Sequence, residues 1–203
     1  MGHLDFPPSG IPVVADASVW INLVESGSAS KILRALPRAV VITDVALREL
    51  ESGRAKGRQT IVGVEDLMTQ NLLSVIKCPE EVEELFLDLV GGDASDTLDD
   101  GEACTLVCAI HLGGAAIIDE RKATNLAGRR FPDLRLFSTT DLILQSDVRL
   151  SLGEHDIADA LFRALTGARM RVPPHRVLEV REILGEERVR LCASLPTWSR
   201  LPR

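Results

Sequence analysis

Short apolar segments that alternate with helical ones constrain the fold of this 203-residue chain more than any other feature. Strands that alternate with helices form parallel βαβ units with right-handed crossovers, in which helices cover both faces of the sheet. We therefore predict an α/β fold, a three-layer α/β/α arrangement around a central parallel sheet. The segments typical of strands are residues 11–14, 39–42, 115–118 and 134–137, with a further edge strand at 72–76.

The strand pattern divides the chain into three parts. Residues 1–10 contain Pro and Gly and form a lead-in, whereas residues 11–148 hold all the predicted strands. Residues 149–203 show two further helical segments and no clear central strand, so we expect a helical C-terminal extension.

Composition limits the classes of function that are open to the chain. Aromatic residues make up 3% of it, which disfavours a sheet that binds RNA by base stacking. A net charge of −7 gives no overall attraction for phosphate backbones. Nucleic-acid binding would therefore depend on a local basic patch or on a metal.

Other sequence features concern location and thiol chemistry. The four cysteines form no C-x-x-C motif, and we expect reduced thiols in a cytoplasmic protein. No apolar run is long enough to span a bilayer, so no membrane partner is expected. Cys104 and Cys108 lie four residues apart on one helical face, but no other Cys or His supplies the remaining ligands locally, which favours core packing over a metal site.

Acidic residues follow the predicted strands in a regular way. Asp16 comes directly after the first strand, and Asp119 comes after the strand at 115–118. Glu49 lies in the helix after the second strand, a helix that Asp44 is expected to cap, and Glu102 lies in the first turn of an apolar helix at 101–112. Ligands of open parallel sheets bind beyond the carboxyl ends of the strands. All four carboxylates can reach one crevice there.

Four carboxylates in one crevice repel each other unless a cation offsets their charge. Oxygen ligands alone select hard cations, which predicts a site for Mg²⁺ or Mn²⁺. Such a cation supports phosphodiester hydrolysis, because it activates water and stabilises charge on a phosphoryl oxygen.

The four acids lie in short motifs that resemble the ordered acidic motifs of PIN-domain nucleases over residues 11–148. The group that they resemble most, the VapC-like toxin ribonucleases, has a Gly-Glu-Ala third motif at a helix start. It often occurs as the toxin of a toxin–antitoxin pair. The motifs are VVADASVWI (13–21), ITDVALREL (42–50), LDDGEA (98–103) and IIDERKA (117–123).

This resemblance implies a Mg²⁺- or Mn²⁺-dependent endoribonuclease with an RNA substrate, and an antitoxin protein and a homodimer as further partners. It also implies supporting hydroxyls at Ser18 and Thr139. The extension lies beyond the end of most small members, so the resemblance implies no role for it. The residues implied to bind metal and activate water are Asp16, Glu49, Glu102 and Asp119.

Each acidic residue also has a structural interpretation. Asp16 could simply cap the helix that follows it, and Glu51 competes with Glu49 on the same helix. Asp99 and Asp100 could cap the apolar helix while Glu102 favours its positive end. The company of Asp119 favours the metal-binding interpretation of Asp16, and the motif matches favour it for Glu49 and Glu102.

Basic residues offer two candidate patches. Arg163, Arg169, Arg171 and Arg176 form an Arg-rich run that is either a solvated surface or a phosphate patch. A second set lies after Asp119, nearer the expected crevice, and supplies the candidate RNA contacts Arg121, Lys122, Arg129 and Arg130.

Two other functions remain open from the sequence. The first is a non-catalytic PIN-fold adapter or scaffold, although a full set of four acids argues against it. The second is a phosphatase with an aspartyl nucleophile at Asp16, although Ser18 stands where that chemistry needs a second Asp.

Overall fold

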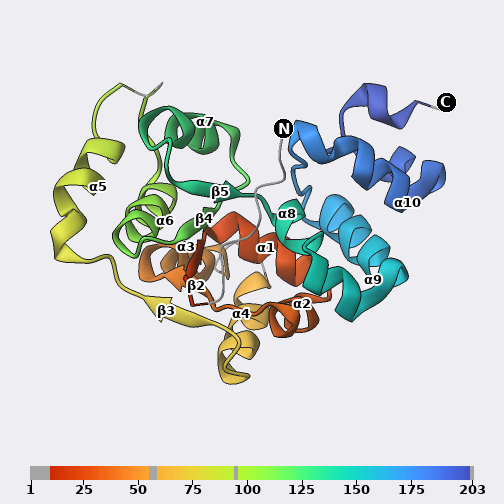
Figure 1. The fold of residues 1–203 in the computed structure, drawn as a ribbon, viewed down its shortest axis with the longest axis horizontal. Helices are drawn as coiled ribbons and strands as arrows, with labels where there is room; N and C mark the ends of the chain where they lie inside the picture. The colour runs from red at the N-terminus through yellow and green to blue at the C-terminus, as the bar shows by residue number, and fades with distance from the viewer. Residues whose placement is uncertain (1–9, 55–58, 94–95, 202–203) are drawn as a thin grey trace.

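The computed structural model describes residues 10–54, 59–93 and 96–201. Most of the predicted lead-in, residues 1–9, lies outside the described residues. Five strands form one parallel sheet in the order β3-β2-β1-β4-β5 (Figure 1). The expected edge strand is β3. The strands are β1 (Val13–Ala15), β2 (Val40–Thr43), β3 (Ser74–Ile76), β4 (Ala115–Ile117) and β5 (Arg135–Phe137).

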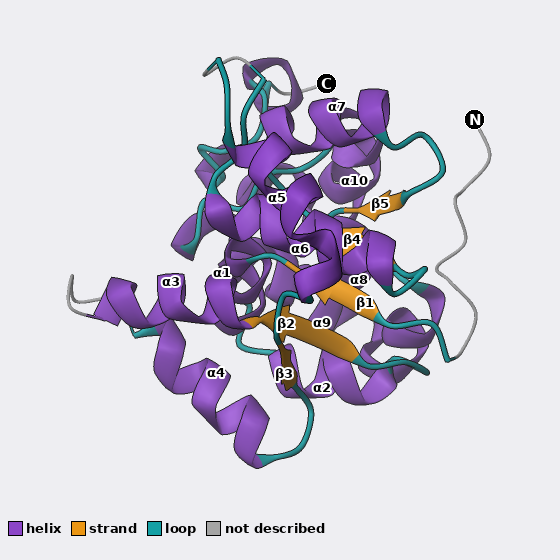
Figure 2. Cartoon of the chain, turned by 90° about the vertical axis from the view of Figure 1, so that its left-hand side faces the viewer, coloured by secondary structure: helices purple, strands orange, loops and turns teal. Residues whose placement is uncertain are grey.

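Helices cover both faces of this sheet, as predicted. In Figure 2, α5 (Glu83–Val90) and α6 (Asp100–His111) lie in front of the strands, and α7 (Arg121–Arg130) joins them on this face. The opposite face packs against α1 (Ala17–Glu25), α2 (Ala29–Ala35), α4 (Thr60–Thr69), α8 (Thr139–Ile143) and α9 (Ser146–Gly167). Alternation of side chains along each strand explains both layers: Val14 faces α6, whereas Val13 and Ala15 face α1.

The helix after β2 begins one residue earlier than expected. Asp44 is the first residue of α3 (Asp44–Arg54) and not its cap. The Thr43 hydroxyl takes the capping role, because its Oγ1 accepts a hydrogen bond of 3.1 Å from the Ala46 backbone N–H. This start fixes the rotation of α3, and with it the direction of Glu49.

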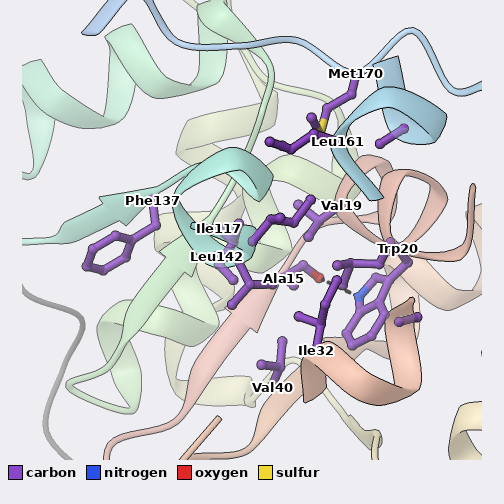
Figure 3. Packing of buried hydrophobic residues seen from close by; sticks show 14 of the residues in the cluster. Ala15, Val19, Trp20, Ile32, Val40, Ile117, Phe137, Leu142, Leu161 and Met170 are labelled. Carbon is purple, nitrogen blue, oxygen red and sulfur yellow. Dashed lines mark hydrogen bonds between the residues drawn. The ribbon is translucent and has the colours of Figure 1, made fainter. Parts of the chain in front are cut away.

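A buried tryptophan anchors α1 to the sheet. Trp20 is fully buried, and its indole Nε1 donates a hydrogen bond of 3.2 Å to the Ala15 carbonyl (Figure 3). Ile32 from α2 and Val40 from β2 belong to the same cluster. The contact holds α1 against the strand end that carries Asp16.

The C-terminal extension is helical, as expected. Helix α9 packs against α1 and α2, and α10 (Val177–Leu191) packs against α9. Both helices bend at a glycine with positive φ, Gly153 at 78° and Gly185 at 71°. No helix in the described ranges combines the length and apolarity that crossing a membrane needs. The described residues also contain 3₁₀ turns at Glu80–Val82, Pro174–Arg176 and Thr197–Arg200.

Truncation of Trp20 tests the anchor. We expect Trp20→Ala to lower the free energy of unfolding by about 3–5 kcal/mol, because it leaves a cavity and removes the partner of the Ala15 carbonyl. Urea denaturation followed by circular dichroism measures the change. Trp198→Ala is the control, since Trp198 is 54% exposed and its loss should change stability by less than about 0.5 kcal/mol. Equal losses of unfolding free energy in the two variants would contradict the role of Trp20 as the anchor of α1.

Candidate active site at the carboxyl edge of the sheet

The site lies where the strand order reverses. After β1 the chain forms β2 and β3 on one side, and it later returns to form β4 on the other side of β1. Asp16 follows β1 directly, and its backbone N–H donates to the Ile117 carbonyl at 3.1 Å. Asp119 lies two residues beyond β4. The reversal therefore places both aspartates beside each other at the position where open α/β sheets bind ligands.

Three donors hold the Asp119 carboxylate. The Thr139 backbone N–H donates to Oδ1 at 2.8 Å, and the Thr139 hydroxyl donates to Oδ2. The Asn22 side-chain amide also donates to Oδ2, at 2.6 Å. These donors come from the start of α8 and from α1, so two helices fix the orientation of one strand-end acid.

Asp16 has a matching arrangement. Its Oδ2 accepts hydrogen bonds from the Ser18 backbone N–H at 3.1 Å and from the Ser18 hydroxyl at 2.8 Å. Asp16 therefore caps α1, and its Oδ1 points toward Gly101, 3.5 Å from where a Cβ on that glycine would lie. Capping and site formation are both roles of this residue, so the two interpretations of Asp16 do not exclude each other.

Three carboxylates meet around Gly101. A Cβ built on this glycine would lie 3.0 Å from Glu49 Oε2, 3.4 Å from Asp99 Oδ1 and 3.5 Å from Asp16 Oδ1. Glu49, Asp99 and Gly101 also line a cleft of about 1120 Å³, which we call the large cleft. Glycine at this position leaves the space into which acids from α3, α6 and β1 point.

Glu102 joins this group from the first turn of α6. Its backbone N–H donates to Asp99 Oδ1 at 2.8 Å, and its own carboxylate accepts from the Asp99 N–H at 3.4 Å, which forms a capping box. Burial, together with the charges of Asp99 and Asp16, raises the pKa of Glu102 to about 7. The carboxylates are therefore close enough to act on each other.

Burial is also the largest influence on the pKa values of Asp16 and Asp119. It raises the pKa of Asp119 to about 6, against the opposing effect of the hydrogen bonds from Thr139 and Asn22. It raises the pKa of Asp16 as well, although the Ser18 donors partly offset the effect. The protein thus keeps several acids where their ionised forms are disfavoured, a pattern that is common at functional sites.

Comparison with known sequences agrees with this geometry. The sequence model of a family described as a PIN domain matches residues 12–186, which is most of the chain. The chain belongs to the PIN-domain family. PIN domains are generally nucleases and typically use divalent metals. A search of curated proteins finds no match to this chain.

The donor set of this PIN domain fits a hard divalent cation. The converging side chains offer carboxylate oxygens alone, which are the ligands that Mg²⁺ and Mn²⁺ prefer. A cation would also favour the ionised forms that burial disfavours. The residues that would hold it are Asp16, Glu49, Glu102 and Asp119, and Asp99 is close enough to join them.

A second, smaller cleft of about 450 Å³ lies on the Asp119 side of the PIN domain and is lined by Arg121, Arg171 and His175. Arg171 Nη1 donates to the Asp119 carbonyl at 3.2 Å. Another candidate of the Arg-rich run, Arg176, forms ion pairs with Asp141 and Glu179 instead. Arg171 is therefore beside the site, whereas Arg176 forms structural ion pairs.

The candidate RNA contacts divide between the two ends of α7. Arg121 and Lys122 lie at its first turn, next to Asp119 in the chain. Arg129 and Arg130 lie at its last turn, roughly 12 Å further along the helix axis. Both are paired there, Arg129 with Asp96 at 3.4 Å and Arg130 with Asp88. The structure does not bring these two arginines to the acids.

Sequence reasoning missed Asn22, and it did not place Arg171, a member of the Arg-rich run, against Asp119. Asn22 is a buried polar residue four positions after Ser18, so the two share one face of α1, and that spacing was the available signal. Arg171 reaches Asp119 across 52 positions of sequence, and no local pattern indicates such a contact. Asp99 was considered as a helix cap, which it is, but it also faces the other acids.

The raised pKa of Glu102 makes the stability of the PIN domain depend on pH. Between the ordinary value of 4.5 and about 7, the folded chain holds a proton that the unfolded chain releases. Stability without metal should therefore fall as pH rises through this interval. The raised pKa of Asp119 acts in the same direction.

We expect Glu102→Gln to reduce this loss of stability with pH, because the amide cannot ionise. Thermal denaturation in EDTA at about pH 5, 6 and 7 measures the slope between the two pKa values. The control is Glu51→Gln on the exposed face of α3, which should keep the wild-type slope. An unchanged slope in Glu102→Gln would show that this carboxyl is not the group that titrates.

Proposed function

We propose that the chain is a divalent-metal-dependent endoribonuclease that hydrolyses RNA phosphodiester bonds with Mg²⁺ or Mn²⁺. The observation that carries the proposal is the meeting of Glu49, Asp99 and Asp16 oxygens around Gly101. Electrostatic coupling of Asp16 to Glu102 and Asp119 extends this group to the remaining acids of the predicted set. The preference for RNA over DNA rests on the resemblance of the acidic motifs.

The side chains around the acids have positioning roles in this proposal. When bound, a divalent cation supplies Lewis-acid stabilisation of phosphoryl charge and lowers the pKa of the attacking water. Ser18 donates to Asp16 and Thr139 donates to Asp119, so each hydroxyl residue helps to fix the orientation of one aspartate. Asn22 donates to Asp119 from α1 and limits its rotation.

Basic residues of the smaller cleft would contact the phosphates of the substrate. Arg121 and Arg171 line the wall beside Asp119, where a phosphate adjacent to the scissile bond would find positive charge. Lys122 is exposed in the same first turn of α7. This local charge offsets the net charge of −7 at the place where RNA has to approach.

The biological role that we propose is that of the toxin of a toxin–antitoxin pair, acting in the cytoplasm. The antitoxin would cover the acids and so block access of RNA to both clefts. A homodimer also remains part of the proposal. The alternative is a PIN-fold scaffold without catalysis, and the next experiment separates the two functions.

Asp16→Asn tests the catalytic proposal. We expect Mn²⁺-dependent cleavage of a fluorescent single-stranded RNA to fall by at least about 100-fold, because a ligand charge is lost while the amide keeps the side-chain shape. The control is Asp133→Asn, a change at an exposed acid in the loop before β5, which should cleave at the wild-type rate. Wild-type protein that neither cleaves RNA nor binds Mn²⁺ would favour the scaffold.

Thr139→Val tests the positioning of Asp119. This change keeps the side-chain volume and the backbone N–H but removes the hydroxyl that donates to Asp119 Oδ2. We expect Mn²⁺ binding, measured by calorimetry, to weaken by about 10–100-fold.

The neighbouring residue gives a matched control for Thr139→Val. Thr140 is also fully buried, and its hydroxyl has no hydrogen-bond partner among the described residues. Thr140→Val should therefore leave Mn²⁺ affinity unchanged. If both variants bind Mn²⁺ as the wild type does, the Thr139 hydroxyl has no role in the metal site.

A further inference from the structure

Three cysteines that are separate in the sequence meet beside the large cleft. Cys104 and Cys108 lie one turn apart on α6, with their sulfur atoms 4.0 Å from each other. Cys78 follows β3 and reaches the same place, so that all three sulfur atoms lie within 4.8 Å of one another. The sequence interpretation as simple core packing did not include Cys78, because only the fold brings it to α6.

These distances suit a single bound ion. A Zn–S bond of about 2.3 Å places neighbouring sulfur atoms about 3.8 Å apart in a tetrahedral site and about 4.0 Å apart in a trigonal one. The separation of Cys104 and Cys108, 4.0 Å, already has this value. The third sulfur needs a shift of less than an ångström, which a rotation of the Cys78 side chain at the end of a loop can supply.

Burial differs among the three residues in a way that allows entry of an ion. Cys104 and Cys108 are 0% and 1% exposed, among the apolar residues between α6 and the sheet. Cys78 is partly exposed and lines the large cleft. An ion could reach the two buried sulfur atoms past Cys78, without any opening of the core.

A fourth ligand is available next to the sulfur atoms. The charge of Asp44 acts on the Cys78 thiol, so the two side chains are near each other. Asp44 Oδ1 is buried and has no hydrogen-bond partner among the described residues, whereas Oδ2 accepts from Arg48 at 2.9 Å. An unpartnered buried carboxylate oxygen carries a free-energy cost that a cation would remove.

We propose that Cys78, Cys104 and Cys108 form a site for the thiophilic cation Zn²⁺, with Asp44 or a water from the large cleft as its fourth ligand. The site is separate from the acids, whose oxygen ligands select Mg²⁺ or Mn²⁺. On binding, the cysteine thiols release their protons to solvent and coordinate as thiolates. Zinc would tie the loop after β3 to α6, the helix that begins with Glu102.

Disulfide formation explains the proximity of these three cysteines less well than a bound cation does. Two cysteines one turn apart on the same helix cannot form a disulfide without disrupting the helix, which excludes the pair on α6. Burial raises the pKa of the Cys78 thiol to about 11, which disfavours the free thiolate that starts disulfide formation. A bound cation needs neither an oxidant nor a rearranged helix.

A cadmium titration of the reduced full-length protein tests the site. Cd²⁺ is the probe because its bonds to thiolates give a sulfur-to-metal charge-transfer band in the ultraviolet. We expect the band to saturate at one ion per chain, and Zn²⁺ to displace Cd²⁺ while Mg²⁺ does not. Absence of the band under these conditions overturns the proposal.

Matched variants assign the ligands. Cys78→Ser should weaken Cd²⁺ binding by at least about 100-fold, because one of three sulfur ligands is lost. Cys192→Ser should bind as the wild type does, since Cys192 lies in the hydrophobic cluster on the other face of the sheet. Equal binding by the two variants overturns the proposal. Asp16→Asn should keep the Cd²⁺ site, which separates this result from any failure of the nuclease proposal.

Alkylation of the wild-type protein makes the test independent of variant folding. An excess of a maleimide should modify Cys78 slowly in the apoprotein, because this thiol lines the large cleft although its raised pKa leaves little thiolate. We expect stoichiometric Zn²⁺ to slow the modification at least tenfold, as followed by mass spectrometry, and Mg²⁺ to have no effect. An alkylation rate that Zn²⁺ leaves unchanged overturns the assignment.

Discussion

Carboxylates are crowded at the point where β1 and β4 direct the chain to opposite sides, and much of the local structure balances this crowding. Burial and mutual repulsion disfavour the charges of Asp16, Glu102 and Asp119. Donors from two helices act against both effects, namely Ser18 and Asn22 in α1 and Thr139 at the start of α8. The acids stay oriented because these donors are themselves fixed by helix starts.

Helix formation and site formation depend on the same residues. Asp16 caps α1, while Asp99 and Glu102 form the capping box of α6. Each acid is therefore positioned by the folding of its helix, with its backbone partner one turn or less away. Such pre-organisation places the cost of bringing like charges together in the folding reaction, so a ligand that binds later does not have to supply it. The arrangement explains why a buried tryptophan behind Asp16 matters to the site.

The sequence was sufficient where short-range physics decides the structure. Apolar runs predicted the strands and the parallel sheet, and Asp16 and Asp119 follow from their places after strands. Rotation of α3 decides between Glu49 and Glu51, and it depends on a cap that was assigned to Asp44 instead of Thr43. Long-range contacts were out of reach: no local signal joins Cys78 to Cys104. Arg171 reaches Asp119 only because the chain after α9 returns to the sheet edge.

The order of the site residues along the chain has a consequence for synthesis. Asp16, Glu49, Glu102 and Asp119 are all synthesised before Thr139, which holds Asp119, and before Arg171, which contacts it. A nascent chain that stops just before α8 has the four acids and Asn22 but lacks the two Thr139 donors to Asp119. Polypeptides that end anywhere in the first two thirds of translation therefore lack the Thr139 donors, and the Arg171 contact forms only in longer chains, so the group of acids is fully oriented late in synthesis.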